Sequence, residues 1–83
     1  MASARWSTDA LKDLEKIDFP IVERIVEKTN WLEKNFATVV PEKLHRELAD
    51  LYKLRVGDYR VIYSIRGDVI FIQSVRHRRD VYR

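Results

Sequence analysis

Hydrophobic and polar positions divide the 83-residue chain into two parts with different periods. In residues 10–32 apolar side chains recur every three or four positions, which is the spacing of one face of an α-helix. The first stripe consists of Ala10, Leu11, Leu14 and Ile17, and the second of Ile21, Val22, Ile25, Val26, Thr29 and Leu32. Ser7 or Thr8 can cap the first helix, and Pro20 suits the first turn of the second. The short connection between them predicts an antiparallel helical hairpin.

From Leu51 onward the period changes to two, which is the period of a β-strand. Three strands are predicted, at 51–56, 59–65 and 69–75, and each connection contains a Gly-Asp pair suited to a two-residue turn with positive φ. Residues 36–49 are ambiguous: an apolar loop, then a turn or short helix around 41–48. Arg5 and Trp6 can add a short edge strand. We therefore expect one α+β domain over residues 1–83, an N-terminal helical hairpin packed on one face of a small antiparallel β-sheet.

The two faces of this sheet differ in character. With two-residue turns, Arg55 lies opposite Arg60, and both share a face with Lys53. The predicted core face carries Tyr52, Leu54, Val56, Tyr59, Val61, Tyr63, Ile65, Ile70 and Ile72. The other face adds Gln73 to the three cations, among Leu51, Ile62, Ser64, Phe71 and Val75. If the third strand is regular, Arg76 points to the core side, and we leave it out of the predicted site.

Three cations on one sheet face form a candidate anion site. Like charges directly opposite on neighbouring strands destabilise a sheet, so Arg55 beside Arg60 is a local cost. Long side chains can reduce this cost by pointing into solvent. A bound anion would instead turn the repulsion into binding, as arginine does with phosphate, and three cations beside a partly apolar floor favour this interpretation.

Charge is unevenly distributed along the chain. Residues 1–50 contain eight Lys and Arg against ten Asp and Glu, a net of −2, whereas residues 51–83 contain eight against three, a net of +5. Residues 74–83 hold four arginines together with His77 and Tyr82. This asymmetry predicts a polyanion or an acidic partner for the C-terminal half. No apolar run resembles a signal peptide or a membrane span, so we expect a cytoplasmic protein.

The residue types narrow the chemistry. The chain has no cysteine, and its basic half has no paired carboxylates, which disfavours disulfides, thiolate nucleophiles, two-metal nucleases and glycosidases. Lysine, arginine, histidine and tyrosine suit RNA cleavage without a metal or cofactor. In that reaction the ribose 2′-hydroxyl attacks its own phosphate, and it needs a base, cations on the phosphate and an acid for the leaving 5′-oxygen.

Two segments resemble a known family. The run Leu51–Tyr63, with its Lys-x-Arg-x-Gly-Asp-Tyr-Arg pattern, and the run His77–Arg83 are similar to the RelE branch of the RelE/ParE toxin superfamily, and Ala10–Leu14 also fits. The resemblance implies a RelE-like, microbial-RNase-like fold. It also implies a type II toxin that cleaves mRNA in the ribosomal A site, inhibits translation and is neutralised by a cognate antitoxin. The small core and basic face predict an antitoxin with an acidic amphipathic helix.

The resemblance also assigns roles to residues. Lys53 matches a lysine near the 2′-hydroxyl and phosphate, and Arg55 and Arg60 match phosphate-holding arginines. Arg78 matches the arginine that supports the leaving oxygen, and Tyr82 matches a tyrosine that stacks on or activates the nucleotide.

Two further residues complete the predicted set. Some relatives use a histidine near His77 as acid or base, and Arg79 is a further candidate for binding phosphate. Leu51 stands where some RelE toxins have a second lysine. The general base therefore remains open among Lys53, His77 and Tyr82.

Two other functions are compatible with the sequence. A ParE-like toxin would bind DNA gyrase without cutting RNA, and a non-catalytic RNA- or ribosome-binding module would need only the basic face. A gyrase-binding protein has no chemical need for Lys53 or Tyr82, so their presence favours the ribonuclease.

Overall fold

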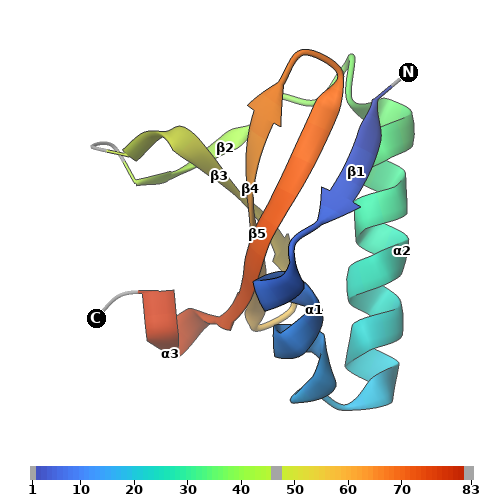
Figure 1. Ribbon diagram of the computed structural model, residues 1–83, viewed down its shortest axis with the longest axis vertical. Coiled ribbons are helices and arrows are strands. Elements are labelled where there is room, and N and C mark those ends of the chain that lie inside the picture. Colours follow the sequence, from blue (N-terminus) through green and yellow to red (C-terminus); the bar gives the residue numbers. More distant parts are fainter. Residues whose placement is uncertain (1, 46–47, 82–83) are drawn as a thin grey trace.

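The computed structural model describes residues 2–45 and 48–81 and shows helices and strands around one mixed sheet (Figure 1). In chain order the elements are β1 (Ser3–Trp6), α1 (Thr8–Glu15), α2 (Phe19–Asn35), β2 (Glu42–His45), β3 (Leu48–Val56), β4 (Tyr59–Arg66), β5 (Val69–His77) and α3 (Arg78–Val81). The strand order in the sheet is β1-β5-β4-β3-β2. The predicted α+β class is confirmed.

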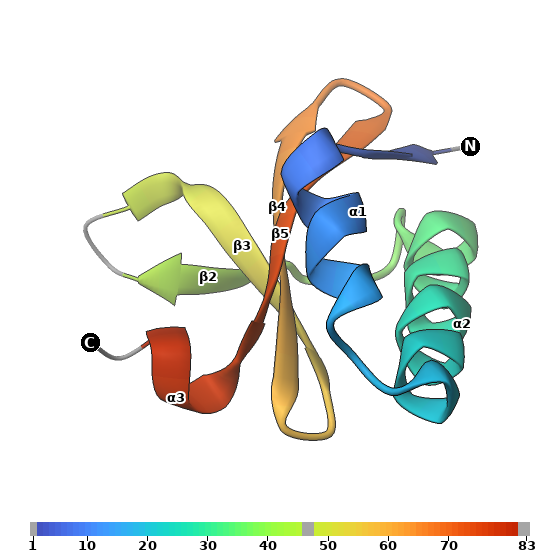
Figure 2. The ribbon, with the colours of Figure 1, turned by 60° about the horizontal axis from the view of Figure 1, so that its bottom comes forward.

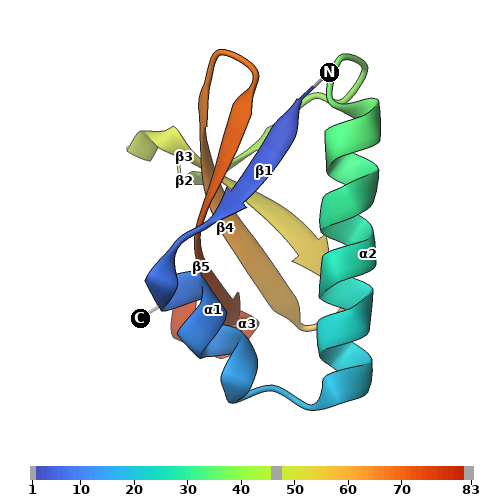
Figure 3. The same cartoon turned by 45° about the vertical axis from the view of Figure 1, so that its right-hand side comes forward.

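At the N-terminus the short edge strand predicted at Arg5 and Trp6 is confirmed as β1, whereas the antiparallel sheet that follows an N-terminal hairpin is not. The chain begins with strand β1 and not with the helical hairpin, and β1 pairs in parallel with β5, so the sheet is mixed and not purely antiparallel. The strand is stabilised by distant partners: the Ala4 amide donates to the Glu33 carboxylate at 2.7 Å, which ties β1 to α2 beside it (Figure 3).

The two long helices form as the sequence predicts. Ser7 caps α1, because its hydroxyl accepts a hydrogen bond from the Ala10 amide at 3.0 Å, and Pro20 lies in the first turn of α2. Both helices lie on the same side of β4 and β5 (Figure 2). Between them and the sheet lies the core, which comprises Ala10, Ile25, Leu32, Leu54, Val56, Val61, Tyr63, Ile70, Ile72 and Val75. Within the described ranges, no helix has the length and apolar character needed to cross a membrane.

The segment that the sequence left ambiguous contains a strand. The turn or short helix expected around 41–48 is wrong, because Glu42–His45 forms β2 and pairs antiparallel with β3. Its burial pattern is mostly exposed, so it lacks the hydrophobic alternation that marks a strand in a sequence. One of its pairs brings opposite charges together, Glu42 with Lys53.

Strand β5 contains a β-bulge that reverses two predicted orientations. The predicted pairs between β3 and β4, including Arg55 with Arg60, are confirmed. Between β4 and β5, however, Ile62 pairs with Ser74 whereas Tyr63 pairs with Ile72, so Gln73 is an extra residue. After this bulge Val75 lies in the core and Arg76 lies on the opposite face. The prediction for both residues was wrong because it assumed a regular strand.

Candidate functional site

The side of the sheet that faces away from α1 and α2 is here called the basic face. Its first row of cross-strand neighbours contains Glu42, Lys53, Ile62 and Ser74, and its second row contains Arg55, Arg60 and Arg76. Helix α3 lies on this side of β5, and β2 borders the same side (Figure 2). The basic face is therefore flanked by two elements that carry polar side chains.

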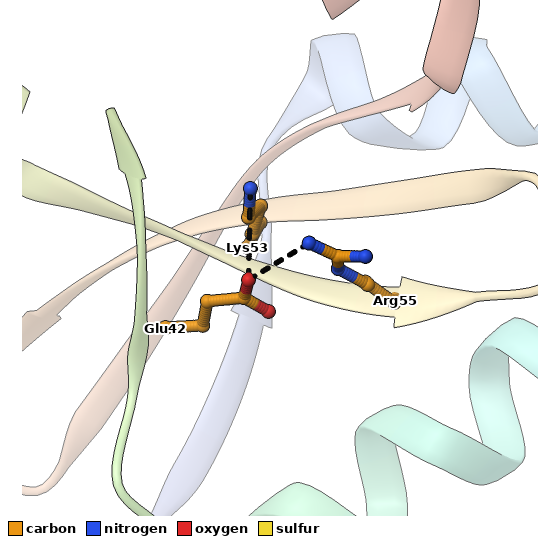
Figure 4. A network of polar contacts seen from close by, with 3 residues as sticks. All are labelled: Glu42, Lys53 and Arg55. Carbon is orange, nitrogen blue, oxygen red and sulfur yellow. Dashed lines mark hydrogen bonds and ion pairs between the residues drawn. The ribbon is translucent and has the colours of Figure 1, made fainter. Parts of the chain in front are cut away.

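Lys53 and Arg55 share one carboxylate. The Glu42 Oε2 atom lies 3.6 Å from Lys53 Nζ and accepts a hydrogen bond of 3.0 Å from Arg55 Nη2 (Figure 4). The Lys53 side chain is only 9 % exposed, although it ends in a charge. Partial burial acts to raise the pKa of Glu42, but the hydrogen bond from Arg55 and the charges of Arg55 and Lys53 outweigh it and lower that pKa. Glu42 is thus ionised at neutral pH and sits where an anionic ligand could bind.

Arg60 is the buried member of the second row, with 7 % of its surface exposed. Its neighbours Arg55 and Arg76 are exposed. Since the three pair directly across β3, β4 and β5, their side chains leave the sheet as neighbours on one face, and the Arg55 guanidinium contacts Glu42. Arginine suits such a position because its planar guanidinium stays charged and presents several donors to an anion.

Helix α1 holds the bulge that places Arg76. The Ser7 hydroxyl donates to the Gln73 carbonyl at 2.8 Å, and the Asp13 carboxylate accepts the Val75 amide hydrogen at 2.9 Å. Both contacts fall on the residues around the register shift. They supply partners for backbone groups on either side of the inserted residue. The orientation of Arg76 on the basic face thus depends on contacts made from the other side of the sheet.

His77 lies on the opposite side of the sheet from Lys53, Arg55 and Arg60. It pairs with Tyr59, which is a neighbour of the core residue Val56, and the two rings meet edge-on with centroids 5.2 Å apart. This register places His77 on the helix side of the sheet, opposite Lys53 and Arg60. Its Nδ1 atom accepts the Arg79 amide hydrogen at 3.2 Å, so the imidazole supports the start of α3.

The remaining predicted residues lie at the C-terminal end. The Arg78 amide donates to the Asp58 carbonyl at 2.8 Å, and the Arg78 guanidinium lies 3.9 Å from the Asp58 carboxylate, which anchors α3 to the β3–β4 turn. Arg78 and Arg79 are both exposed on α3, beside the basic face. Tyr82 lies outside the described residues. The structure therefore groups Lys53, Arg55 and Arg60 on one face. The two arginines of α3 lie at the edge of that face.

Two site residues were missed by sequence reasoning, Glu42 and Arg76. Glu42 comes from the segment without a clear period, so no sequence signal linked it to Lys53. Arg76 was left out on the assumption of a regular strand. Within the described part of the chain, no group of three or more His, Asp or Glu side chains is arranged to hold a metal ion.

The fold and the basic face define a small α+β protein with one sheet face covered by helices and the other suited to binding an anion. Residues 4–82 match the family described as "ParE toxin of type II toxin-antitoxin system, parDE". The chain therefore belongs to the RelE/ParE superfamily of type II toxins, and the resemblance seen in the sequence is confirmed.

Two relatives from M. tuberculosis give the same assignment. The chain is 34 % identical to toxin RelG of Mycobacterium tuberculosis over 98 % of this chain and 95 % of that protein. It superimposes on the RelBE2 toxin–antitoxin complex of M. tuberculosis with a TM-score of 0.79 and 32 % identity, covering 92 % of this chain and 96 % of that one. A chromosomal ParDE system of P. aeruginosa shares the fold, with a TM-score of 0.76 and 19 % identity over 93 % and 96 % of the two chains.

Proposed function

We propose that this toxin is a ribosome-dependent mRNA endonuclease that cleaves mRNA in the A site without a metal and so inhibits translation. The observation that carries the proposal is the placement of a nearly buried lysine, Lys53, one row from the buried Arg60 on the same sheet face. Burying two cations is unfavourable unless anions or a polar network compensate them. Glu42 already lies beside Lys53, and a ribose-phosphate bound on this face would bring a further anion to both cations.

The residues of the basic face fit the steps of this reaction. Lys53, Arg55 and Arg60 would stabilise the negative charge that develops on the phosphate as the 2′-oxygen attacks it. The bond from phosphorus to the 5′-oxygen then breaks, leaving a 2′,3′-cyclic phosphate and a 5′-hydroxyl. Arg78 would support the leaving oxygen from the edge of the face.

The sequence leaves the identity of the general base open. The arrangement of the side chains favours a different set of candidates for this role. His77 lies on the other side of the sheet, which argues against direct proton transfer by its imidazole. Glu42 joins Lys53 and Tyr82 as a candidate, because its ionised carboxylate lies 3.6 Å from the Lys53 ammonium. A carboxylate placed beside the phosphate site can accept the 2′-hydroxyl proton.

We also propose a cognate antitoxin and a cytoplasmic location. The similar M. tuberculosis structure is a toxin–antitoxin complex, and residues 51–83 of this chain carry a net charge of +5. An acidic amphipathic helix would complement that charge and cover the sheet edge, the helices or the tail. Its binding would raise the thermal unfolding midpoint of the toxin.

A ParE-like toxin that binds gyrase is the second candidate, because the matching family is described by ParE and the P. aeruginosa ParDE structure shares the fold. Docking to a protein surface does not require a nearly buried lysine beside a buried arginine. The internal position of Lys53 and Arg60 therefore favours chemistry on a nucleotide. A non-catalytic RNA- or ribosome-binding module would use the exposed cations alone.

One experiment separates these functions. Purified toxin is added to translating ribosomes, the 5′ ends of the mRNA are mapped, and gyrase supercoiling is measured in parallel. We expect cuts within A-site codons that disappear in Arg78→Ala and persist in Lys12→Ala, which removes an exposed positive charge from α1. Inhibited supercoiling with intact mRNA would support the gyrase function instead. If the mRNA stays intact and supercoiling is unaffected, the non-catalytic binding module is the function that remains.

A further inference from the structure

The second row of the basic face contains more positive charge than one phosphate needs. One carboxylate, that of Glu42, contacts both Lys53 and Arg55, so a single anionic group fits between these two side chains. Arg76 belongs to β5, two strands from β3, which places it roughly 10 Å from Arg55 across the sheet. Arg60 lies between them.

This arrangement is costly, and the fold maintains it. Like charges directly opposite one another on neighbouring strands destabilise a sheet, and Glu42 offsets this at Arg55, the end of the row far from Arg76. A regular β5 would avoid the cost, since Arg76 would then point to the other face. The register shift at Gln73 instead brings Arg76 beside Arg60, and the contacts from Ser7 and Asp13 hold the shifted strand. β-Bulges often re-aim a side chain next to a binding site.

We propose that Arg76, together with Arg60, forms a second phosphate-binding subsite next to the one at Lys53 and Arg55. The ligand is then a single nucleic-acid strand that places two consecutive phosphates on the basic face. One phosphate lies at each end of the row formed by Arg55, Arg60 and Arg76, here called the arginine row. This inference rests on the proposed function for the identity of the strand as RNA. Ser7 and Asp13 are positioning residues, because they act through the register of β5 and do not touch the ligand.

The test compares two ligands that lack the 2′-hydroxyl and so cannot be cleaved. Thymidine 5′-monophosphate carries one phosphate, and the 5′-phosphorylated dinucleotide pdTpdT carries two. Dissociation constants are measured by NMR titration of the full chain at fixed salt. We expect Arg76→Gln to weaken binding of the dinucleotide about tenfold, the effect of losing one charged contact, and to leave binding of the mononucleotide nearly unchanged. For the dinucleotide, the slope of the logarithm of the binding constant against the logarithm of the salt concentration should decrease in magnitude by about one.

The control is Lys12→Gln on α1, which makes the same charge change at an exposed position on the helix side and should affect neither ligand selectively. The proposal is overturned if Arg76→Gln weakens both ligands equally or weakens neither. Because these ligands cannot react, the result is independent of catalysis. If Arg76→Gln selectively weakens dinucleotide binding but the wild-type toxin leaves mRNA intact, the second subsite stands and the nuclease function is refuted.

The positioning role of Asp13 has its own comparison. Asp13→Ala and Asp13→Asn remove the same charge, but only the asparagine retains an oxygen that can accept the Val75 amide hydrogen. We expect Asp13→Ala to lose the preference for the dinucleotide and Asp13→Asn to keep it, with folding of both checked by circular dichroism. Equal preference in the two variants would show that the contact does not position Arg76.

Discussion

Replacing Glu42 by glutamine tests whether its carboxylate stabilises the cations of the basic face. Gln keeps the size of the side chain and can still accept a hydrogen bond, but it removes the charge that faces Lys53 and Arg55. The variant therefore measures the electrostatic part of the interaction. Lys53 is the sensitive partner, because its side chain is only 9 % exposed and solvent screens its charge poorly.

The expected loss is modest. The side chains of Glu42 and Arg55 are 49 % and 58 % exposed, so their ion pair is screened and contributes in the range of about 0.2–1 kcal/mol. The contact with the nearly buried Lys53 adds a comparable amount, which gives roughly 1 kcal/mol for the two together. In a domain of this size that free energy corresponds to a fall of about 4–8 °C in the thermal unfolding midpoint.

The pH dependence of stability tests whether the charge of Glu42 causes the loss in Glu42→Gln. The pKa of Glu42 is lowered in the folded protein, so its contribution is present above the ordinary value of 4.5 and is lost as the pH falls through the lowered pKa. Thermal unfolding followed by circular dichroism should show a gap between the unfolding midpoints of wild type and Glu42→Gln at pH 7. This gap should narrow below pH 4.5. A gap that persists unchanged at low pH would refute the reasoning. So would an equal loss in Glu23→Gln, the same charge change on an exposed turn of α2.

Three further predictions concern the core, a turn and a buried phenol. Leu32→Ala, at a fully buried position, should lower the free energy of unfolding by about 2–5 kcal/mol in urea denaturation, whereas Leu11→Ala, at a position 52 % exposed, should cost far less. Gly67 has φ +55°, so Gly67→Ala should cost about 1–2 kcal/mol by the same assay and Gly67→Asn less. Burial, with the nearby Tyr52 and Glu42, raises the pKa of Tyr63. Its phenol should therefore ionise above pH 10 in an absorbance titration, and the associated stability should be lost as the pH rises through that raised pKa; a phenolate signal unchanged in Tyr63→Phe would contradict this.

The parts of the fold that sequence alone predicted are those fixed by local chemistry. The cap at Ser7 and the proline in the first turn of α2 mark helix starts within a few residues. Gly57 and Gly67 have φ of +58° and +55°, as two-residue turns require, and these turns fix the register of the strands they join. The pairing of Arg55 with Arg60 followed directly from the first turn.

The parts that could not be predicted depend on contacts between distant segments. The bulge at Gln73 leaves the alternation of residues 69–72 intact and reverses the orientation only of residues after it, so the sequence pattern gives no warning of it. It is held by side chains of Ser7 and Asp13, more than 60 residues earlier in the chain. Strand β2 depends on pairing with β3 and has little apolar character of its own, which is why Glu42 was missed.

The arginine row also predicts that binding and stability oppose each other in this toxin. If Arg76 lies beside Arg60 for the sake of an anion, then without an anion its charge is a net cost to the sheet. Arg76→Gln should raise the free energy of unfolding of the ligand-free toxin by a few tenths of a kcal/mol at low ionic strength. The gain should shrink in high salt, which screens the repulsion. A destabilised Arg76→Gln would mean that the arginine is held by favourable contacts within the fold, and the row would then need no ligand to explain it.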